Sequence, residues 1–309
     1  MNDKLKGYLL GTVAAATYGM NPLFALPLYA DGMNADSVLF FRYLFAIVIL
    51  GVMLKWRGQN FKVERRALLP LAVMGTLMAF SSLFLFQSYN YMDAGIASSL
   101  LFVYPIMVAV MMTCFFHERL TWQTVVCMGL ALLGIWLLYQ GDDGTTLSVF
   151  GTVLVMLSAL SYAVYIVYIN RSSLNDMPTV KVTFYVLVVG SIVFGVRLLC
   201  AGEVLTPQRW YMWGNLVSLA LFPTAISLVC TTRAIQFIGS TPTAILGALE
   251  PVTAVIIGVL VFGEMLTVRS VSGIVLIIVA VSLIVAGGSV GKLFLRLRKM
   301  FPKVVRGGM

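Results

Sequence analysis

The chain carries the same sequence pattern twice. The segment PIMVAVMMTCFFHERLT begins at Pro105 and has Glu118 thirteen residues on, and PVTAVIIGVLVFGEMLT begins at Pro251 and has Glu264 at the same spacing, an offset of 146 residues. Nearer the starts of the two halves the offset is 144 residues, and the matching pairs are Gly7/Gly151, Ala15/Ala159 and Tyr18/Tyr162. Repetition over this length indicates that one structural unit was duplicated. We predict a first repeat over residues 1–144, a second over 145–290 and a basic tail over 291–309.

The composition excludes an ordinary soluble globule. Soluble domains are about 45 to 50% apolar and about 25% charged, whereas this chain is 60% hydrophobic and 11% charged, with a mean hydropathy of +0.97. Its apolar segments are long and apolar on all sides, which favours membrane-spanning helices over barrel strands. We predict ten spans, near residues 8–30, 38–56, 67–90, 95–115, 121–139, 149–169, 180–200, 211–236, 243–262 and 268–287.

The basic residues predict the orientation, because cytoplasmic loops retain Lys and Arg. With a cytoplasmic N-terminus, only Arg42, Arg197, Arg209 and Arg269 fall toward the other side. We therefore expect both termini in the cytoplasm. Since five spans per repeat is an odd number, the second repeat would enter the membrane upside down relative to the first. This inverted-topology repeat is the arrangement of many transporters.

Several other functions lack support in the sequence. The net charge of +9 follows the orientation signal and the tail suits anionic lipid, so we expect no nucleic-acid partner. Neither His117, the only histidine, nor the scattered cysteines, nor the Asp142–Asp143 pair in a turn has the convergent ligands of a metal site. No catalytic or phosphate-binding motif is present. We expect no enzyme activity, no cofactor and no metal.

These features together resemble the EamA branch of the drug/metabolite transporter superfamily. The resemblance rests on the duplicated pattern Pro, thirteen residues, then Glu-x-Leu-Thr at the foot of a span, on Phe41-Arg42 opening the second span, and on two halves of five spans. It implies export or exchange of a small metabolite across a bacterial cytoplasmic membrane, driven by gradients and not by ATP. One departure is His117, where such proteins often carry the Gly that Gly263 keeps in the second half.

Glu250 is the outstanding candidate for a functional residue. It lies about eight residues into the ninth predicted span with no basic neighbour in sequence, and a charge inside the bilayer is costly unless it serves a path or a partner. Pro251 follows it and would free or kink the preceding turn. The equivalent residue of the first half is Tyr104, before Pro105. Glu250 is either a pathway or coupling residue, or a structural partner held by an arginine.

Other charged residues have two readings each. Arg233 lies at a comparable depth and is the expected arginine partner of Glu250, whereas Arg42 opens the second span from the other face. Either arginine could bind an anionic solute, or could extend to the lipid headgroups. Glu118 and Glu264 are expected at opposite membrane faces, where they would cap or tether helix ends.

Uncharged polar residues complete the candidate lining. Within the predicted spans they are Tyr18, Asn21, Gln87, Asn90, Tyr104, Tyr162 and Tyr165. They could line an aromatic, amphipathic cavity for a small metabolite. They could equally form interhelical hydrogen bonds and interfacial aromatic belts.

The sequence therefore predicts an all-α integral membrane protein of ten transmembrane helices, arranged as two inverted-topology five-helix repeats. We expect a secondary-active transporter that works by alternating access, with Glu250 taking and releasing a proton as the solute moves. The partners would be a small-molecule substrate, the lipid bilayer and protons, in a monomer or a homodimer. The alternative is a non-coupled channel, or a lipid-handling or scaffold membrane protein.

Overall fold

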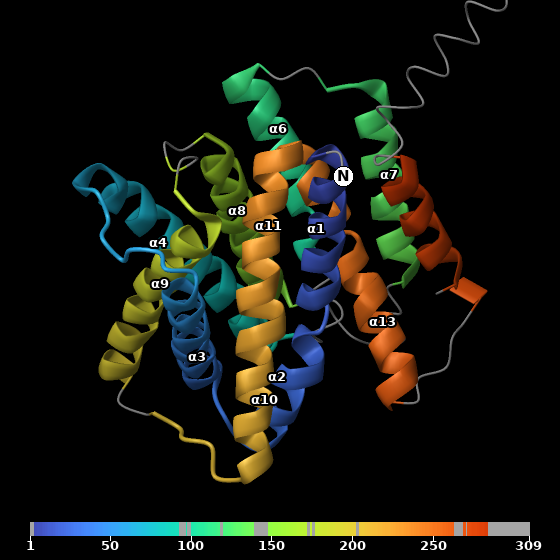
Figure 1. Cartoon of the computed structure of the whole chain (residues 1–309). Coiled ribbons are helices and arrows are strands. Elements are labelled where there is room, and N and C mark those ends of the chain that lie inside the picture. The colour runs from blue at the N-terminus through green and yellow to red at the C-terminus, as the bar shows by residue number, and fades with distance from the viewer. Residues whose placement is uncertain are drawn as a thin grey trace, which may run out of the picture.

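The fold is known from a computed structural model that describes residues 3–92, 97, 100–117, 120–138, 148–171, 174, 177–201, 204–262, 268–269 and 271–283. Within these residues every regular element is a helix, and no strand occurs (Figure 1). The helices are α1 (Asp3–Tyr18), α2 (Asn21–Ala30), α3 (Ala35–Trp56), α4 (Arg65–Ser88), α6 (Tyr104–Phe116), α7 (Trp122–Leu138), α8 (Val149–Arg171), α9 (Thr179–Ala201), α10 (Trp210–Ala220), the π-helical η2 (Leu221–Ile226), α11 (Ser227–Ile238), α12 (Ser240–Leu246), α13 (Leu249–Phe262) and one over Val271–Leu283.

By length and composition, six of the described helices could cross a membrane. They are α1 with α2, α3, α4, α8, α9, and α10 continued through η2 into α11. Three shorter apolar helices are α6, α7 and the helix over Val271–Leu283. The predicted basic tail and the predicted helix-end residues Glu118 and Glu264 lie outside the described residues.

The helix ends follow local sequence signals. The side chain of Asn34 accepts a hydrogen bond from the Ser37 amide at 2.8 Å and so caps the start of α3. His117 ends α6 in the left-handed conformation, with φ of 56°, and its amide bonds to the carbonyls of Met112 and Thr113. Glycine adopts this conformation without steric cost, which explains why a Gly is expected where this chain has His117.

The two halves pack their equivalent helices in the same way. The most extensive helix pairs are α4 with α8 and α1 with α11. Figure 1 shows α1 alongside α11 at the front of the bundle. α1 and α8 hold the first spans of the two halves, and α4 and α11 belong to their third spans. Each half therefore packs its first span against the third span of the other half, so the two halves are interlocked.

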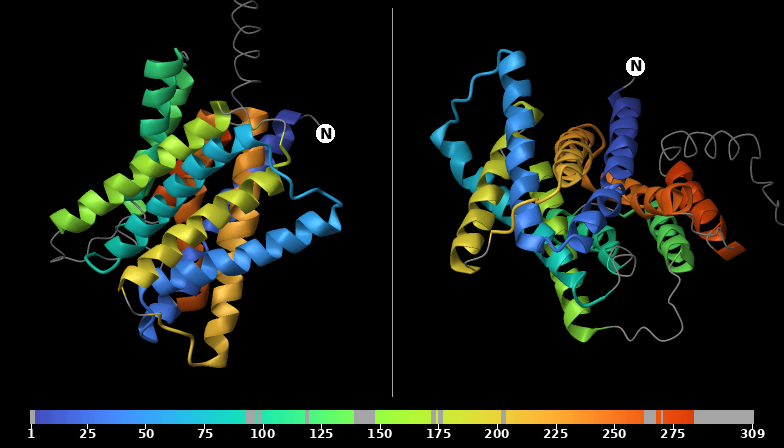
Figure 2. Two further views of the ribbon diagram at one scale, coloured as in Figure 1. Left: turned by 90° about the vertical axis from the view of Figure 1, so that its left-hand side faces the viewer. Right: turned by 90° about the horizontal axis from the view of Figure 1, so that it is seen from below.

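Four predicted spans are interrupted within the described residues. The first divides at Gly19–Met20 into α1 and α2, and the ninth divides at Gly247–Ala248 into α12 and α13. The fourth has a turn at Phe102–Val103, directly before α6. The eighth widens into the π-helical η2 around Pro223. Proline lacks an amide hydrogen, so it is tolerated in a first helical turn or where the helix ladder is already broken. The bundle in Figure 2 therefore combines continuous helices, such as α3, α4, α8 and α9, with interrupted ones.

Candidate functional site

Glu250 and two of the predicted tyrosines, Tyr104 and Tyr162, meet at a pocket. The free volume inside this Glu250 pocket is about 10 Å³, which is room for about one water molecule. Its lining residues are Gly11, Ala14, Ala15, Tyr104, Tyr162, Ile166, Thr231, Thr243, Gly247 and Glu250. They come from α1, α6, α8, α11, α12, α13 and the turn between the last two, so both halves contribute. This free volume is far below the roughly 300 to 1,000 Å³ of typical drug-sized ligand sites, so the pocket has no room for a solute in this conformation.

The pocket is built around residues that the duplication relates. Tyr104 and Glu250 are equivalent at the offset of 146, and Tyr18 and Tyr162 at the offset of 144. The ring of Tyr162 meets Tyr104 edge to face at 4.9 Å between centroids and stacks on Tyr18 at 6.4 Å and on Tyr165 at 6.1 Å. Four of the predicted lining residues therefore form one aromatic cluster. An inverted repeat produces such a meeting point because equivalent positions approach each other along its pseudo-two-fold axis.

Glu250 lies in the first turn of α13, at the break that follows Gly247. Its amide donates to the Gly247 carbonyl at 2.8 Å, and its partly buried side chain borders the pocket. The carboxyl interacts electrostatically with Tyr18, Tyr104 and Tyr162. A helix N-terminus favours a negative charge, but no cation pairs with Glu250 among the described residues.

Close backbone contacts hold the break in place. The hydroxyl of Tyr104 donates to the Ala244 carbonyl at 3.2 Å and lies where a Gly247 side chain would be. At Gly19, the end of α1 approaches the backbone carbonyl of Glu250 so closely that a Cβ would overlap it. Glycine is therefore required for this contact between α1 and α13.

Arg42 is buried and contacts the interrupted eighth span. Its side chain is 1% exposed, so it does not extend to the headgroups. Its Nε donates to the Thr224 hydroxyl, its Nη2 donates to the Pro223 carbonyl at 3.3 Å, and the guanidinium lies 5.5 Å from the centroid of the Phe86 ring. We refer to Arg42, Phe86, Pro223 and Thr224 as the Arg42 centre. Tyr18 interacts electrostatically with both Arg42 of this centre and Glu250 of the pocket.

Arg233 does not join the pocket. It is exposed on α11, donates to the Gln236 side chain at 3.0 Å, and stacks over the Phe237 ring at 4.8 Å. The predicted pair of Arg233 with Glu250 is therefore absent from this structure. The two residues lie on different helices, and their similar depth in the sequence says nothing about the directions in which their side chains point.

Gln87 and Asn90 belong to a different polar group at the end of α4. Gln87 donates to the Asp36 carboxylate at 3.5 Å and accepts from the Asn90 amide at 3.3 Å. Arg197 holds the same carboxylate with two hydrogen bonds, of 2.9 and 3.2 Å. This ion pair joins the first half to the second. Sequence reasoning missed Asp36, although an acid in the first turn of a span was a usable signal.

The remaining predicted residues are placed as follows. Pro105 and Pro251 both lie in the first turn of a helix, α6 and α13 respectively. Asn21 begins α2 and is buried, and neither atom of its amide group has a partner within the described protein. No group of three or more His, Cys, Asp and Glu side chains that could hold a metal ion occurs in the part of the chain that the structure describes.

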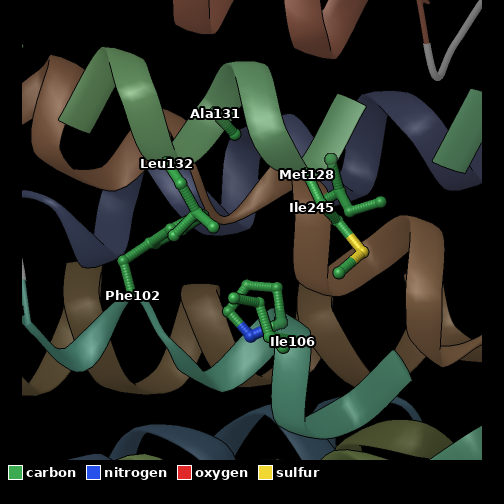
Figure 3. Close-up of a pocket in the computed structure, with 7 residues that line it drawn as sticks. Phe102, Ile106, Met128, Ala131, Leu132 and Ile245 are labelled. Carbon is green, nitrogen blue, oxygen red and sulfur yellow. The ribbon is translucent and has the colours of Figure 1, made fainter. Parts of the chain in front are cut away.

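A second pocket, also of about 10 Å³, is apolar (Figure 3). Phe102 and Ile106 face Met128, Ala131 and Leu132 of α7 across it. Pro105 and Ile245 complete the lining. It contains no polar side chain that could orient a solute or carry a charge, so we do not assign it to transport.

The family is decided by the sequence comparison. The sequence model of the EamA-like transporter family matches residues 5–140 and again residues 149–286. The chain belongs to the EamA-like transporter family. The predicted resemblance and the predicted fold class are thereby confirmed, because EamA proteins have ten membrane helices in two repeats. As a member of this family the protein is a multi-pass membrane transporter.

Similar proteins agree with this assignment. An uncharacterized transporter of Archaeoglobus fulgidus is 28% identical, over 81% of this chain and 86% of its own. The uncharacterized transporter YdfC of Bacillus subtilis is 26% identical, over 79% of each chain. The threonine/homoserine exporter RhtA of Escherichia coli is 26% identical, over 72% of this chain and 71% of its own. A solved crystal structure with 17% identity shares the EamA-like fold, with a TM-score of 0.74 over 90% of this chain and 95% of the other.

Proposed function

We propose that this protein is a secondary-active transporter that exports or exchanges a small metabolite by alternating access between its two repeats, residues 1–144 and 145–290. The solute would be an amino acid, a nucleobase or related compound, or a drug. The proposed location is a bacterial cytoplasmic membrane with both termini in the cytoplasm. The observation that carries the proposal is that Tyr104 and its equivalent Glu250 line one closed pocket between the halves, together with Tyr162, which stacks on its own equivalent Tyr18.

Glu250 is the proposed coupling residue. Among the described residues it is the carboxyl group that borders the pocket, and no arginine or lysine neutralises it. A carboxyl group that is withdrawn from water and lacks a cationic partner favours its protonated form, and it releases the proton when water returns. Opening the pocket alternately to each side of the membrane would therefore move a proton with, or against, the solute.

The test is counterflow in proteoliposomes. The full-length protein is reconstituted with pooled amino acids, nucleobases, sugar phosphates or organic cations, and labelled uptake is followed with and without an imposed pH gradient. We expect saturable exchange of one class that responds to the gradient. Glu250→Gln should retain exchange at equal pH and lose the gradient response, because the amide cannot release a proton.

Glu64→Gln is the matched control, because Glu64 is exposed ahead of α4 and far from the pocket in the chain. It should behave as the wild type. An unchanged gradient response in Glu250→Gln would exclude the coupling role. Flux that never saturates would instead favour a non-coupled channel, and absence of flux in every pool would favour a lipid-handling or scaffold protein.

A further inference from the structure

The Arg42 centre lacks a negative partner. Arg42 is 1% exposed, and no carboxylate among the described residues forms an ion pair with it. Burial of an unpaired charge is costly, and the contacts that Arg42 does make are with a hydroxyl, a carbonyl and an aromatic face. These dipoles offset only part of the cost. The nearest acid in its own helix, Asp36, is already held by Arg197.

One nitrogen of the guanidinium also remains available. Nε and Nη2 are used on Thr224 and Pro223, but Nη1 is buried and has no hydrogen-bond partner in the described protein. Buried polar atoms are almost always hydrogen-bonded, and each exception needs an explanation. Because the other two nitrogens fix the orientation of the plane, Nη1 is held ready to donate.

Two side chains on α2 are also buried with polar atoms that have no hydrogen-bond partner. The hydroxyl of Tyr29 and both atoms of the Asn21 amide group are buried without a partner within the described residues. The centroid of the Tyr29 ring lies 6.2 Å from that of the Phe86 ring, and the Arg42 guanidinium lies over the same Phe86 ring. Tyr29 also interacts electrostatically with Arg42. Unused donors on three side chains therefore occur in the region between α2, α3 and η2.

Asn21 reaches this region from the other end of α2. Three residues beyond it, Phe24 stacks on Phe222 of η2 at 6.1 Å, next to the Pro223 carbonyl that Arg42 binds. Asn21 and Tyr29 are eight residues apart, about 12 Å at the helical rise. At this separation, Asn21 and Tyr29 would hold different groups of one solute.

We propose that the Arg42 centre is the binding site for a carboxylate of the transported solute. Arg42 Nη1 and the Tyr29 hydroxyl donate to the carboxylate, and the Asn21 amide holds a second polar group nearer the Glu250 pocket. This inference rests on the proposed transport function and names its substrate class as small carboxylic acids, amino acids included. A single guanidinium suits a monoanion. A phosphate dianion would call for a second cation, which the described residues do not place at this centre.

The test uses monocarboxylic acids and their matched amides, which have nearly the same shape but lack the carboxylate charge. Threonine is compared with threonine amide, and butyrate with butyramide, by thermal stabilisation of the purified full-length protein and by inhibition of counterflow. We expect at least one acid to stabilise and to inhibit at concentrations about tenfold or more below its amide, the effect of a hydrogen bond to a charged group. Equal potency of acids and amides would overturn the proposal, whether or not counterflow itself is established.

Two variants separate ligand binding from folding. Tyr29→Phe and Asn21→Leu remove atoms that have no partner in the protein, so the melting temperature without ligand should stay the same or rise. Each should weaken the effect of the acid about tenfold if the removed atom binds the solute. Tyr91→Phe is the control, because Tyr91 is exposed and packs on Phe150.

The variants also distinguish the two proposals. Unchanged acid affinity in Tyr29→Phe and Asn21→Leu would overturn the carboxylate site and leave water as the partner of these atoms, while saturable counterflow would still support the transporter. Loss of acid stabilisation in both variants would support the site even if the pools used for counterflow contained no transported solute.

Discussion

The Glu250 pocket and the Arg42 centre both lie beside an interrupted helix, yet they are built differently. The pocket is lined by Tyr104 and Glu250, which the duplication relates, and by Tyr162, which stacks on its equivalent Tyr18. The Arg42 centre has no such counterpart. The residue 144 positions after Arg42, the offset that relates Tyr18 to Tyr162, is Val186, which is fully buried in apolar surroundings.

The comparison shows that the repeat accounts for the shape of the pocket, whereas the charges come from sequence differences between the two halves. Tyr104 and Tyr162 are the aromatic members of the pocket lining, and the Tyr104 hydroxyl packs against Gly247 at the break between α12 and α13. The charged residues occupy positions at which the two halves differ in sequence. Glu250 is equivalent to Tyr104, and Arg42 is equivalent to Val186. Two repeats of the same fold allow the pocket to open in an equivalent way to either side of the membrane. A charged residue that is present in one repeat and absent from the other gives the two repeats different roles.

The largest expected effect comes from removing that divergence at the pocket. Glu250→Tyr makes the two halves identical at this position, so no titratable carboxyl borders the pocket. Gradient-driven uptake should fall to the level of empty liposomes, measured in the counterflow assay above. The exchange variant with Tyr104→Glu added to Glu250→Tyr returns a carboxyl to the pocket from the other half.

Partial recovery of the gradient response in this double variant would indicate that the carboxyl must border the pocket but can come from either half. No recovery, in protein that still folds, would indicate that the position at the start of α13 is itself required. If gradient-driven uptake survives in Glu250→Tyr alone, the difference in charge between the two halves at the pocket is not needed for coupling.

A smaller effect is expected from the contact of Tyr104 with Gly247. In Gly247→Ala the added Cβ overlaps the Tyr104 hydroxyl and lies 3.0 Å from the Ala244 carbonyl. Overpacking of this kind costs up to about 3 kcal/mol, and the melting temperature in detergent should fall. Adding Tyr104→Phe removes the hydroxyl and should recover part of the loss, because the nearest remaining ring atom is 3.1 Å away.

Gly214→Ala is the matched control for this pair. Gly214 lies inside α10, and a Cβ there meets no atom within 4 Å. Since Ala is a better helix former than Gly, this variant should be neutral or more stable by up to about 1 kcal/mol. A similar loss of stability in both glycine variants would show that the loss in Gly247→Ala does not come from the contact with Tyr104.

The sequence predicted the pocket better than it predicted the Arg42 centre, for a physical reason. Polar and aromatic residues inside apolar spans are conspicuous, and the fixed offset indicates which of them are equivalent. Arg42 was conspicuous too, but its partners Pro223 and Thr224 lie some 180 residues away. Local sequence does not reveal that Pro223 widens the helix into a π-turn instead of kinking it.

The structure also separates residues that the sequence groups together. Polarity gives the depth of Gln87 and Asn90 in a span and not the direction of their side chains. They bind around Asp36 instead. Arg233 was paired with Glu250 on depth alone, and its contacts are with its own helix. Side-chain direction depends on helix rotation, which packing between the two halves decides.

The smallest expected effect concerns the link between Arg42 and the interrupted span. The Thr224 hydroxyl accepts from Arg42 and donates to the Leu219 carbonyl at 2.8 Å, so one buried group stabilises both the arginine and the π-helical turn. Thr224→Val keeps the shape and leaves both partners unsatisfied, which should cost about 1 to 2 kcal/mol. Two quantities are measured for the variant, its melting temperature in detergent and its affinity for the acid that binds at the Arg42 centre.

Thr183→Val is the control for this substitution. Thr183 is equally buried, but its hydroxyl donates only to the Thr179 carbonyl of its own helix, at 3.0 Å. We expect Thr183→Val to have the smaller effect on stability and none on acid affinity. If Thr224→Val loses stability but keeps full acid affinity, Arg42 is positioned without η2, and the asymmetry between the two centres lies in α2 and α3 alone.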